Sequence, residues 1–163
     1  MADSLVPASA RAMIGEVTAG PRSAEVTARD AQRYARAVDD LNPLYFDEAA
    51  ARAAGYRTLV APPTFLDHVT VEGGEVADMR TDGIFAGAEQ RGPQLGRVMF
   101  GGQEWDWLEP AYVGDTITAT QRLTAIDEKR GTKGPFVLVT WETQYTNQHG
   151  AVVARSRQQG ISR

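Results

Sequence analysis

The chain has 163 residues, a formal net charge of −4, 42% hydrophobic residues and no cysteine. This length suits one domain with a sizeable core, and the acidic balance argues against a nucleic-acid-binding surface. The absence of cysteine excludes disulfides, thiol catalysis and cysteine-based zinc sites, and because only two histidines are present we expect no metal site.

Residues 1–13 lack the long apolar core of a secretory signal and carry Asp3 near their start. We expect them to form a flexible N-terminal arm, followed by a single domain over residues 14–163. Because no run of about 18 apolar residues occurs, we expect no membrane span. The resulting expectation is a cytoplasmic protein.

The first half of the chain predicts one strand and several short helices. Thr and Asp are favoured at helix N-caps, and proline is tolerated in a first helical turn. The expected elements are an edge strand or an extended entry segment over residues 17–26, a helix over 28–38 capped by Thr27, a helix over 48–54 capped by Asp47 and followed by Gly55, and an apolar helix over 64–69 after Pro62-Pro63.

The second half predicts antiparallel strands. Residues 72–96 are rich in glycine and charge, so we expect a long surface loop there. Strand patterns follow over residues 98–108, 116–128, 136–147 and 151–161, with a hairpin turn at His149-Gly150. Helices followed by an antiparallel meander indicate the α+β class.

Between the first two helices lies the segment Asp39-Asp40-Leu41-Asn42-Pro43-Leu44-Tyr45-Phe46-Asp47. Pro43 fixes its own φ and disfavours the helical region for Asn42, so the segment is predicted to be a stiff, non-helical crossing. Such a crossing can hold the Asp40 carboxylate and the Tyr45 phenol at a set angle over a cavity. We expect Asn42 and Pro43 to be structural, with the Asn42 side chain fixing the loop.

The pattern Asp40-x-Asn42-Pro43-Leu44 resembles the Asp-x-Asn-Pro-aliphatic-His signature of MaoC-like, R-specific enoyl-CoA hydratases. Further motifs resemble the N-terminal-type MaoC dehydratase domain, in the order Ala61-Pro62-Pro63-Thr64-Phe65, Phe100-Gly101-Gly102-Gln103-Glu104-Trp105, Gly114-Asp115-Thr116 and Tyr145-Thr146-Asn147-Gln148-x-Gly150. The resemblance covers the chain from roughly Ile14 onward. It implies a hot-dog fold, in which an antiparallel sheet wraps around a central helix, here the one expected over residues 64–69.

The resemblance also implies a reaction, the hydration of an enoyl thioester or the reverse dehydration, with coenzyme A or an acyl carrier protein as substrate carrier and no further cofactor. This reaction needs a group that activates water, a proton donor and a hydrogen-bond donor to the thioester oxygen. The motif implies Asp40 for the water, with Tyr45 at the second catalytic position. The backbone N–H of Thr64 or Phe65 is the candidate thioester donor, because the two preceding prolines have none.

Tyr45 departs from the family motif, which has histidine there. A phenol with a pKa near 10 is a poor base at neutral pH. Three interpretations follow. In the preferred one, the chain is the degenerate, supporting subunit of a heterodimer whose hot-dog partner carries Asp and His. In the second, it is a self-sufficient homo-oligomeric hydratase that uses Asp40 with Tyr45 or another acid. In the third, it is a non-catalytic hot-dog protein that binds acyl thioesters.

Two further groups of residues are candidates for substrate contacts. Lys129, Arg130 and Lys133 form a basic loop that either meets the phosphates of coenzyme A or is simply a solvated hairpin. Trp105 and Trp107 are expected to share one strand face, with Trp141 on a neighbouring strand. These indoles are candidates both for lining a cavity and for core packing.

Overall fold

The structure is a computed structural model, which describes residues 4–70, 98–132 and 134–162. The loop expected over residues 72–96 and the candidate phosphate ligand Lys133 lie outside the described residues. The described elements, in chain order, are α1 (Ala8–Ala12), β1 (Val17–Glu25), α2 (Ala28–Ala37), the 3-10 helix η1 (Pro43–Tyr45), α3 (Glu48–Ala53), α4 (Phe65–Thr70), β2 (Val98–Trp107), β3 (Thr116–Gly131), β4 (Gly134–Thr146) and β5 (Val152–Ser162). None of the helices described there is long and apolar enough to cross a membrane.

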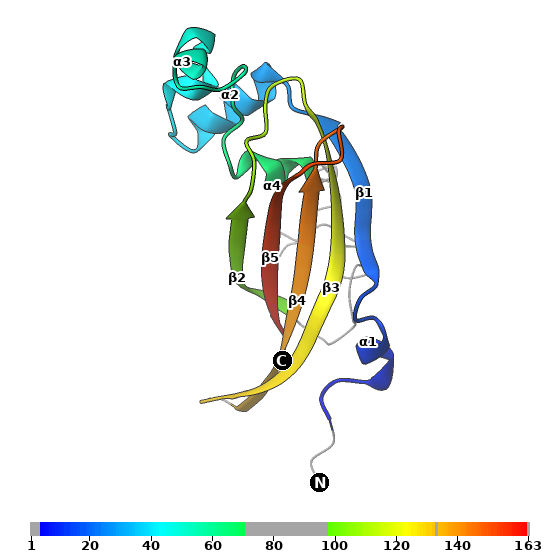
Figure 1. Cartoon of the computed structure of the whole chain (residues 1–163). Coiled ribbons are helices and arrows are strands. Elements are labelled where there is room, and N and C mark those ends of the chain that lie inside the picture. The colour runs from blue at the N-terminus through cyan, green and yellow to red at the C-terminus, as the bar shows by residue number, and fades with distance from the viewer. Residues whose placement is uncertain (1–3, 71–97, 133, 163) are drawn as a thin grey trace, which may run out of the picture.

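The strands form one five-stranded antiparallel sheet in the order β1-β3-β4-β5-β2. β1 is therefore an edge strand, as predicted, and β2 forms the other edge. In Figure 1, α4 lies against one face near one end of the sheet, and α2 and α3 lie beyond that end. The β3–β4 hairpin reaches the opposite end. The expected α+β class is confirmed.

Alternation along β4 explains which face of the sheet is covered. Val137, Val139 and Tyr145 lie on one face and are each at most 4% exposed. Leu138 and Gln144 point to the other face and are more accessible. Because side chains alternate along a strand, the burial pattern of β4 alone shows which face of the sheet the core covers.

The core under α4 joins the helix to the middle of the sheet. Phe65 and Leu66 of α4 are each 2% exposed and belong to one cluster with Ile117, Tyr145 and Ala154 of three different strands. Each large apolar side chain buried in this way contributes about 1.5–3 kcal/mol relative to exposure. The cluster fixes the start of α4, and with it the preceding turn, on the sheet.

A second cluster lies farther along the same sheet and includes the N-terminal segment. Val6 and Ala10 pack with Leu123 and Val139. Residues 4–13 therefore contact the sheet in the structure, although we expected residues 1–13 to be an arm. The flexibility of that segment stays a prediction.

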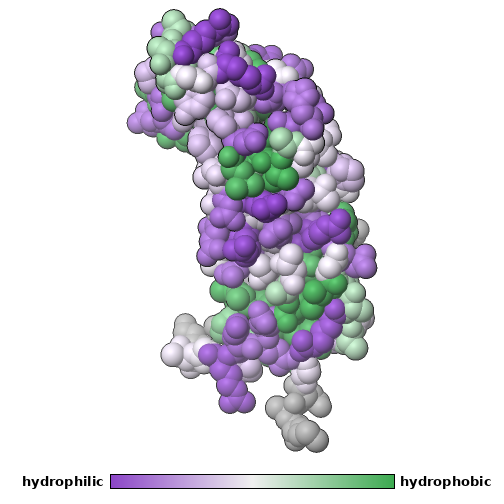
Figure 2. Space-filling model, viewed as in Figure 1, coloured by the Kyte–Doolittle hydropathy of each residue, from purple (hydrophilic) through white to green (hydrophobic). Residues whose placement is uncertain are grey.

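The opposite face of the sheet carries a row of alternating charges. Arg122 of β3 pairs in register with Glu142 of β4, which pairs with Arg157 of β5, which pairs with Glu104 of β2. The last two form an ion pair of 3.0 Å. Figure 2 shows a hydrophilic band across the middle of the visible surface, with hydrophobic areas above and below it. Opposite charges on neighbouring strands favour this register.

Candidate active site

A rigid turn carries the Asn-Pro segment from α2 to α3. The chain reverses at Asp39, which adopts a left-handed conformation with a φ of 58°, a region that Asp tolerates better than most residues. Asn42 then caps η1, because its Oδ1 accepts a hydrogen bond from the Leu44 N–H at 3.1 Å. Pro43 occupies the first position of this 3-10 helix. The backbone of the segment is thus fixed by the residues that the motif supplies.

The turn brings Asp40 and Tyr45 into direct contact. The Tyr45 hydroxyl donates a hydrogen bond to Asp40 Oδ2 at 3.1 Å. Asp40 Oδ1 accepts a longer one of 3.4 Å from the Asn42 N–H. Tyr45 is buried, with 7% of its surface exposed, whereas Asp40 is exposed. Gln32 of α2 donates to the Tyr45 carbonyl at 3.2 Å and so fixes the backbone of the buried residue.

The surroundings of Tyr45 keep its hydroxyl protonated. Burial raises the pKa of Tyr45 to about 12, and the hydrogen bond to Asp40 and the negative charge of that carboxylate act in the same direction. The anion would lie against another negative charge, so the neutral phenol is favoured. Tyr45 therefore acts at neutral pH as a hydrogen-bond donor to Asp40, and it cannot accept a proton from water.

The candidate thioester donor lies in the turn before α4. The Phe65 N–H donates to the Pro62 carbonyl at 3.0 Å, so this donor is already used within the turn. For the Thr64 N–H, no hydrogen bond to any of the described residues is present. Of the two expected donors, only that of Thr64 remains available to a ligand.

Tyr34 connects the two halves of the candidate site. Its hydroxyl donates to Thr64 Oγ1 at 2.9 Å. Its ring meets the Phe65 ring edge-on, with centroids 5.7 Å apart. Because α2 leads directly to Asp40, this contact ties the position of Asp40 to the turn that carries Thr64.

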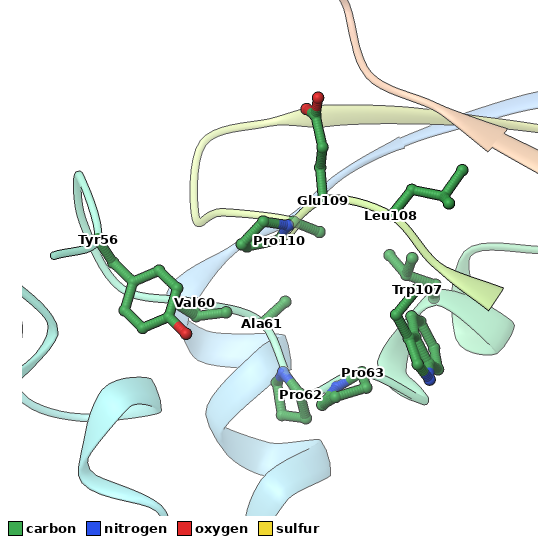
Figure 3. Close-up of a pocket in the computed structure, with 11 residues that line it drawn as sticks. Tyr56, Val60, Ala61, Pro62, Pro63, Trp107, Leu108, Glu109 and Pro110 are labelled. Carbon is green, nitrogen blue, oxygen red and sulfur yellow. The ribbon is translucent and has the colours of Figure 1, made fainter. Parts of the chain in front are cut away.

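A pocket of about 260 Å³ lies beside this turn. Its wall includes Tyr56, Pro62, Pro63, Leu66, Trp107 and Pro110. Figure 3 shows Trp107 on one side of the pocket and Tyr56 on the other, with the two prolines between them. The pocket is therefore lined mainly by apolar and aromatic groups, as small-molecule sites usually are.

A family model for the FAS1-like dehydratase domain region matches residues 12–156 of this chain. The chain belongs to this dehydratase family.

Three curated relatives are similar to this chain. A "UPF0336 protein" of Thermobifida fusca is 31% identical over 150 residues, which are 90% of this chain and 88% of the relative. A "UPF0336 protein" of Streptomyces griseus is 34% identical over 111 residues, which span 66% of this chain and 66% of the relative. The "Probable enoyl-CoA hydratase alpha subunit" of Thermomonospora curvata is 28% identical over 155 residues, which are 90% of this chain but only 48% of that protein.

Solved structures confirm the hot-dog fold. A MaoC-like dehydratase superposes with a TM-score of 0.70 at 22% identity, over 93% of this chain and 42% of that chain. The ChsH1-ChsH2 complex from Mycobacterium tuberculosis gives 0.68 at 21% identity, over 88% and 87% of the two chains. The C-terminally truncated HadBC complex from the same organism, a 3R-hydroxyacyl-ACP dehydratase, gives 0.66 at 22% identity, over 92% and 97%. Two of these three structures are complexes of two different subunits.

Within this family fold, the basic loop lies far from the other candidate residues. Lys129 and Arg130 are exposed near the end of β3, where β3 meets β4 in a hairpin. This hairpin and the α2–α3 region lie at opposite ends of the sheet (Figure 1). The structure therefore does not bring Lys129 or Arg130 together with Asp40 in one chain, and their proposed phosphate contact would have to serve a site in a neighbouring subunit.

Asp115, from the Gly114-Asp115-Thr116 motif, is a buried charged residue close to the pocket segments. Asp115 is 1% exposed, and its carboxylate accepts hydrogen bonds from Arg57, from Gln148 at 3.0 Å and from the Tyr112 N–H at 2.9 Å. Burial acts to raise the pKa of Asp115, but these donors outweigh it and hold the pKa below its usual value. Asp115 thus joins the two segments that form opposite walls of the pocket.

The three tryptophans fall into two groups. Trp105 and Trp107 share a strand face, as expected, and their indoles stack. Trp141 packs against the second cluster instead, and β5 separates its strand from β2. The expectation of a neighbouring strand was wrong, because β5 returns between β4 and β2 and no sequence pattern gives that strand order.

Proposed function

We propose that this chain is the supporting subunit of a heteromeric hydro-lyase that hydrates enoyl thioesters or dehydrates 3-hydroxyacyl thioesters. The observation that carries the proposal is the Tyr45–Asp40 hydrogen bond at the position of the catalytic motif. An active site of this type needs a residue that alternates between proton acceptor and donor near neutral pH. A buried phenol with a pKa of about 12 cannot alternate in that range.

The chain retains groups that would help a catalytic partner. The N–H of Thr64, which makes no hydrogen bond to a described residue, is a candidate donor to a thioester oxygen. Donors positioned for a developing negative charge are a major source of catalysis. The pocket beside it would receive part of the acyl chain. Coenzyme A or an acyl carrier protein would be the carrier, and no other cofactor is needed.

The edge strand β2 is the candidate surface for a second hot-dog subunit. Four exposed large hydrophobic residues lie on this strand or directly after it, namely Met99, Phe100, Trp107 and Leu108. Phe100 is 68% exposed. An edge strand with apolar side chains is unfavourable in isolation and is a natural position for pairing. Pairing there would cover Met99 and Phe100, which lie at the start of β2, whereas Trp107 and Leu108 at its other end line the pocket.

A self-sufficient homo-oligomer is the second candidate, favoured by the exposure of Asp40. An exposed carboxylate can orient water while Tyr45 donates to it. This alternative requires another acid to deliver the proton. The third candidate, a non-catalytic protein that binds acyl thioesters, requires only the pocket.

The test is an assay of enoyl-CoA hydration by the purified chain, with and without a partner that carries Asp-x-Asn-Pro-x-His. We expect no activity from the chain alone and activity from the mixture. Activity of the chain alone that disappears in Asp40→Ala would instead establish the self-sufficient enzyme. Binding without activity in any mixture would support the third candidate.

A substitution within the motif sharpens this test. Tyr45→His restores the family residue and should give the isolated chain activity on the order of 10² or more above Tyr45→Phe, since a positioned acid–base group contributes about that factor. Tyr45→Phe is the matched control, because it removes the hydroxyl without adding a titratable group. Equal activity of the two variants would mean that more than the histidine has been lost.

A further inference from the structure

Three aromatic rings form a continuous stack that ends at the pocket. Trp107, in the pocket wall, stacks on Trp105 with ring centroids 4.5 Å apart and an interplanar angle of 4°. Trp105 in turn stacks on Tyr145 at 5.2 Å and 28°. The two indoles are two residues apart on β2, and Tyr145 comes from β4. The stack therefore runs from β2 across β5 to β4.

The inner end of this stack is fixed. Tyr145 is 1% exposed, and its hydroxyl donates to Asp67 Oδ1 of α4 at 3.3 Å. A buried ring held at both its hydroxyl and its face has little freedom to tilt. The orientation of Trp107 thus follows from packing deep in the sheet, so its indole plane is set before a ligand binds.

The outer face of Trp107 is open towards the pocket. One indole face is covered by Trp105, yet Trp107 remains 43% exposed. The facing wall includes Pro62, Pro63 and Leu66, which bring no charge. The carboxylate of Glu109 points away from the pocket in Figure 3. Among the described residues, the side chains that face a ligand here are a flat aromatic surface and apolar walls.

We propose that this pocket selects planar, apolar acyl groups, such as aryl or fused-ring acyl thioesters, over linear chains of the same carbon number. This inference rests on the proposed function in that it names the acyl class of the same substrate. A rigid ring loses little conformational freedom on binding, whereas a linear chain loses conformational entropy at each rotatable bond that becomes ordered. Stacking on an aromatic partner adds about 0.5–1.5 kcal/mol beyond area burial. The volume of about 260 Å³ suits a small ring system.

The test compares two enoyl thioesters of pantetheine with nine acyl carbons each, cinnamoyl and trans-2-nonenoyl. Both contain a trans-enoyl thioester, and they differ in whether the carbons beyond Cβ form a phenyl ring or a linear saturated chain. Isothermal titration of the purified chain should give a dissociation constant about 3- to 10-fold lower for cinnamoyl. Trp107→Leu, which keeps apolar bulk but removes the flat face, should abolish the preference. Trp107→Phe should retain part of it.

Trp141→Phe is the control, because Trp141 packs in the other cluster, and it should leave the preference unchanged. Urea midpoints of all variants verify that they fold. Equal affinity for the two probes, no binding of either, or a preference that persists in Trp107→Leu would overturn the inference. If the chain alone catalyses hydration and still prefers cinnamoyl, the supporting-subunit role is refuted and the inference stands.

Discussion

The hydroxyl of Tyr45 donates to Asp40 Oδ2 across 3.1 Å, and this contact places a proton donor on the carboxylate where the related motif has histidine. The pair is half exposed, because Asp40 faces solvent while Tyr45 is buried. The contact therefore serves to fix the turn as well as to define its chemistry.

Tyr45→Phe should lower the free energy of unfolding by about 1 kcal/mol. A hydrogen bond to a charged group contributes about 1.5–3 kcal/mol when buried, and solvent at Asp40 reduces this value. Urea denaturation measures the change. Tyr56→Phe is the matched control, since no hydrogen bond of the Tyr56 hydroxyl to the described residues is present. A loss of the same size in both variants would show that the Asp40 bond contributes nothing specific.

The raised pKa of Tyr45 predicts a loss of stability at alkaline pH. The folded protein holds the phenol protonated up to about 12, whereas the unfolded chain ionises near the ordinary value of 10.0. The contribution of Tyr45 is therefore fully present below pH 10 and is lost as pH rises through about 12. The free energy of unfolding, measured with urea across this pH range, should fall less steeply in Tyr45→Phe than in the parent chain. Identical slopes would refute the shift.

Asp115→Ala should be strongly destabilising, by about 2–4 kcal/mol, because it leaves Arg57, Gln148 and the Tyr112 N–H without their shared acceptor. Asp127→Ala, at an exposed position of β3, should change stability by less than about 0.5 kcal/mol. Thermal unfolding compares the two variants, and similar melting temperatures would contradict the role of Asp115.

The lowered pKa of Asp115 predicts a loss of stability at acidic pH. Its pKa is held below the usual value in the folded state, so its contribution is present above the unfolded value of 3.8 and is lost as pH falls through the folded pKa. The parent chain should therefore lose more stability than Asp115→Asn when pH is lowered past 3.8. Parallel pH profiles for the two proteins would contradict this origin.

The N-terminal segment offers a pair of neighbouring positions with opposite environments. Val6 is 3% exposed and Leu5 is 45% exposed. Val6→Ala should cost about 1–2 kcal/mol through lost burial and a small cavity, whereas Leu5→Ala should be nearly neutral. Denaturant midpoints measure both. If neither substitution matters, the segment does not pack on the sheet in solution, as the expected flexible arm requires.

Local features of the fold could be predicted from the sequence. Thr27 and Asp47 cap α2 and α3 because the capping bond joins residues only two or three positions apart. The β4 strand was predictable because its alternation reports burial directly. These features need no knowledge of distant contacts.

Features that depend on distant residues could not be predicted. The partners of the Asp115 side chain include Arg57 and Gln148, 58 and 33 residues away. The donor to the Thr64 hydroxyl is 30 residues away. Sequence patterns carry no information on which polar residues meet across such separations. The motif indicated Asp40 and Tyr45 as site candidates within six residues of each other, but the hydrogen bond between them was not predicted.

The charged row of Arg122, Glu142, Arg157 and Glu104 limits how the protein can assemble. Two such faces stacked on each other would remove eight charges from water, and desolvation of ion pairs commonly exceeds what their attraction returns. A slip of one residue between any two of these strands would also break the alternation of sign. The row thus favours one strand register and keeps this face of the sheet in contact with solvent. A second subunit would therefore bind at an edge of the sheet and not on this face.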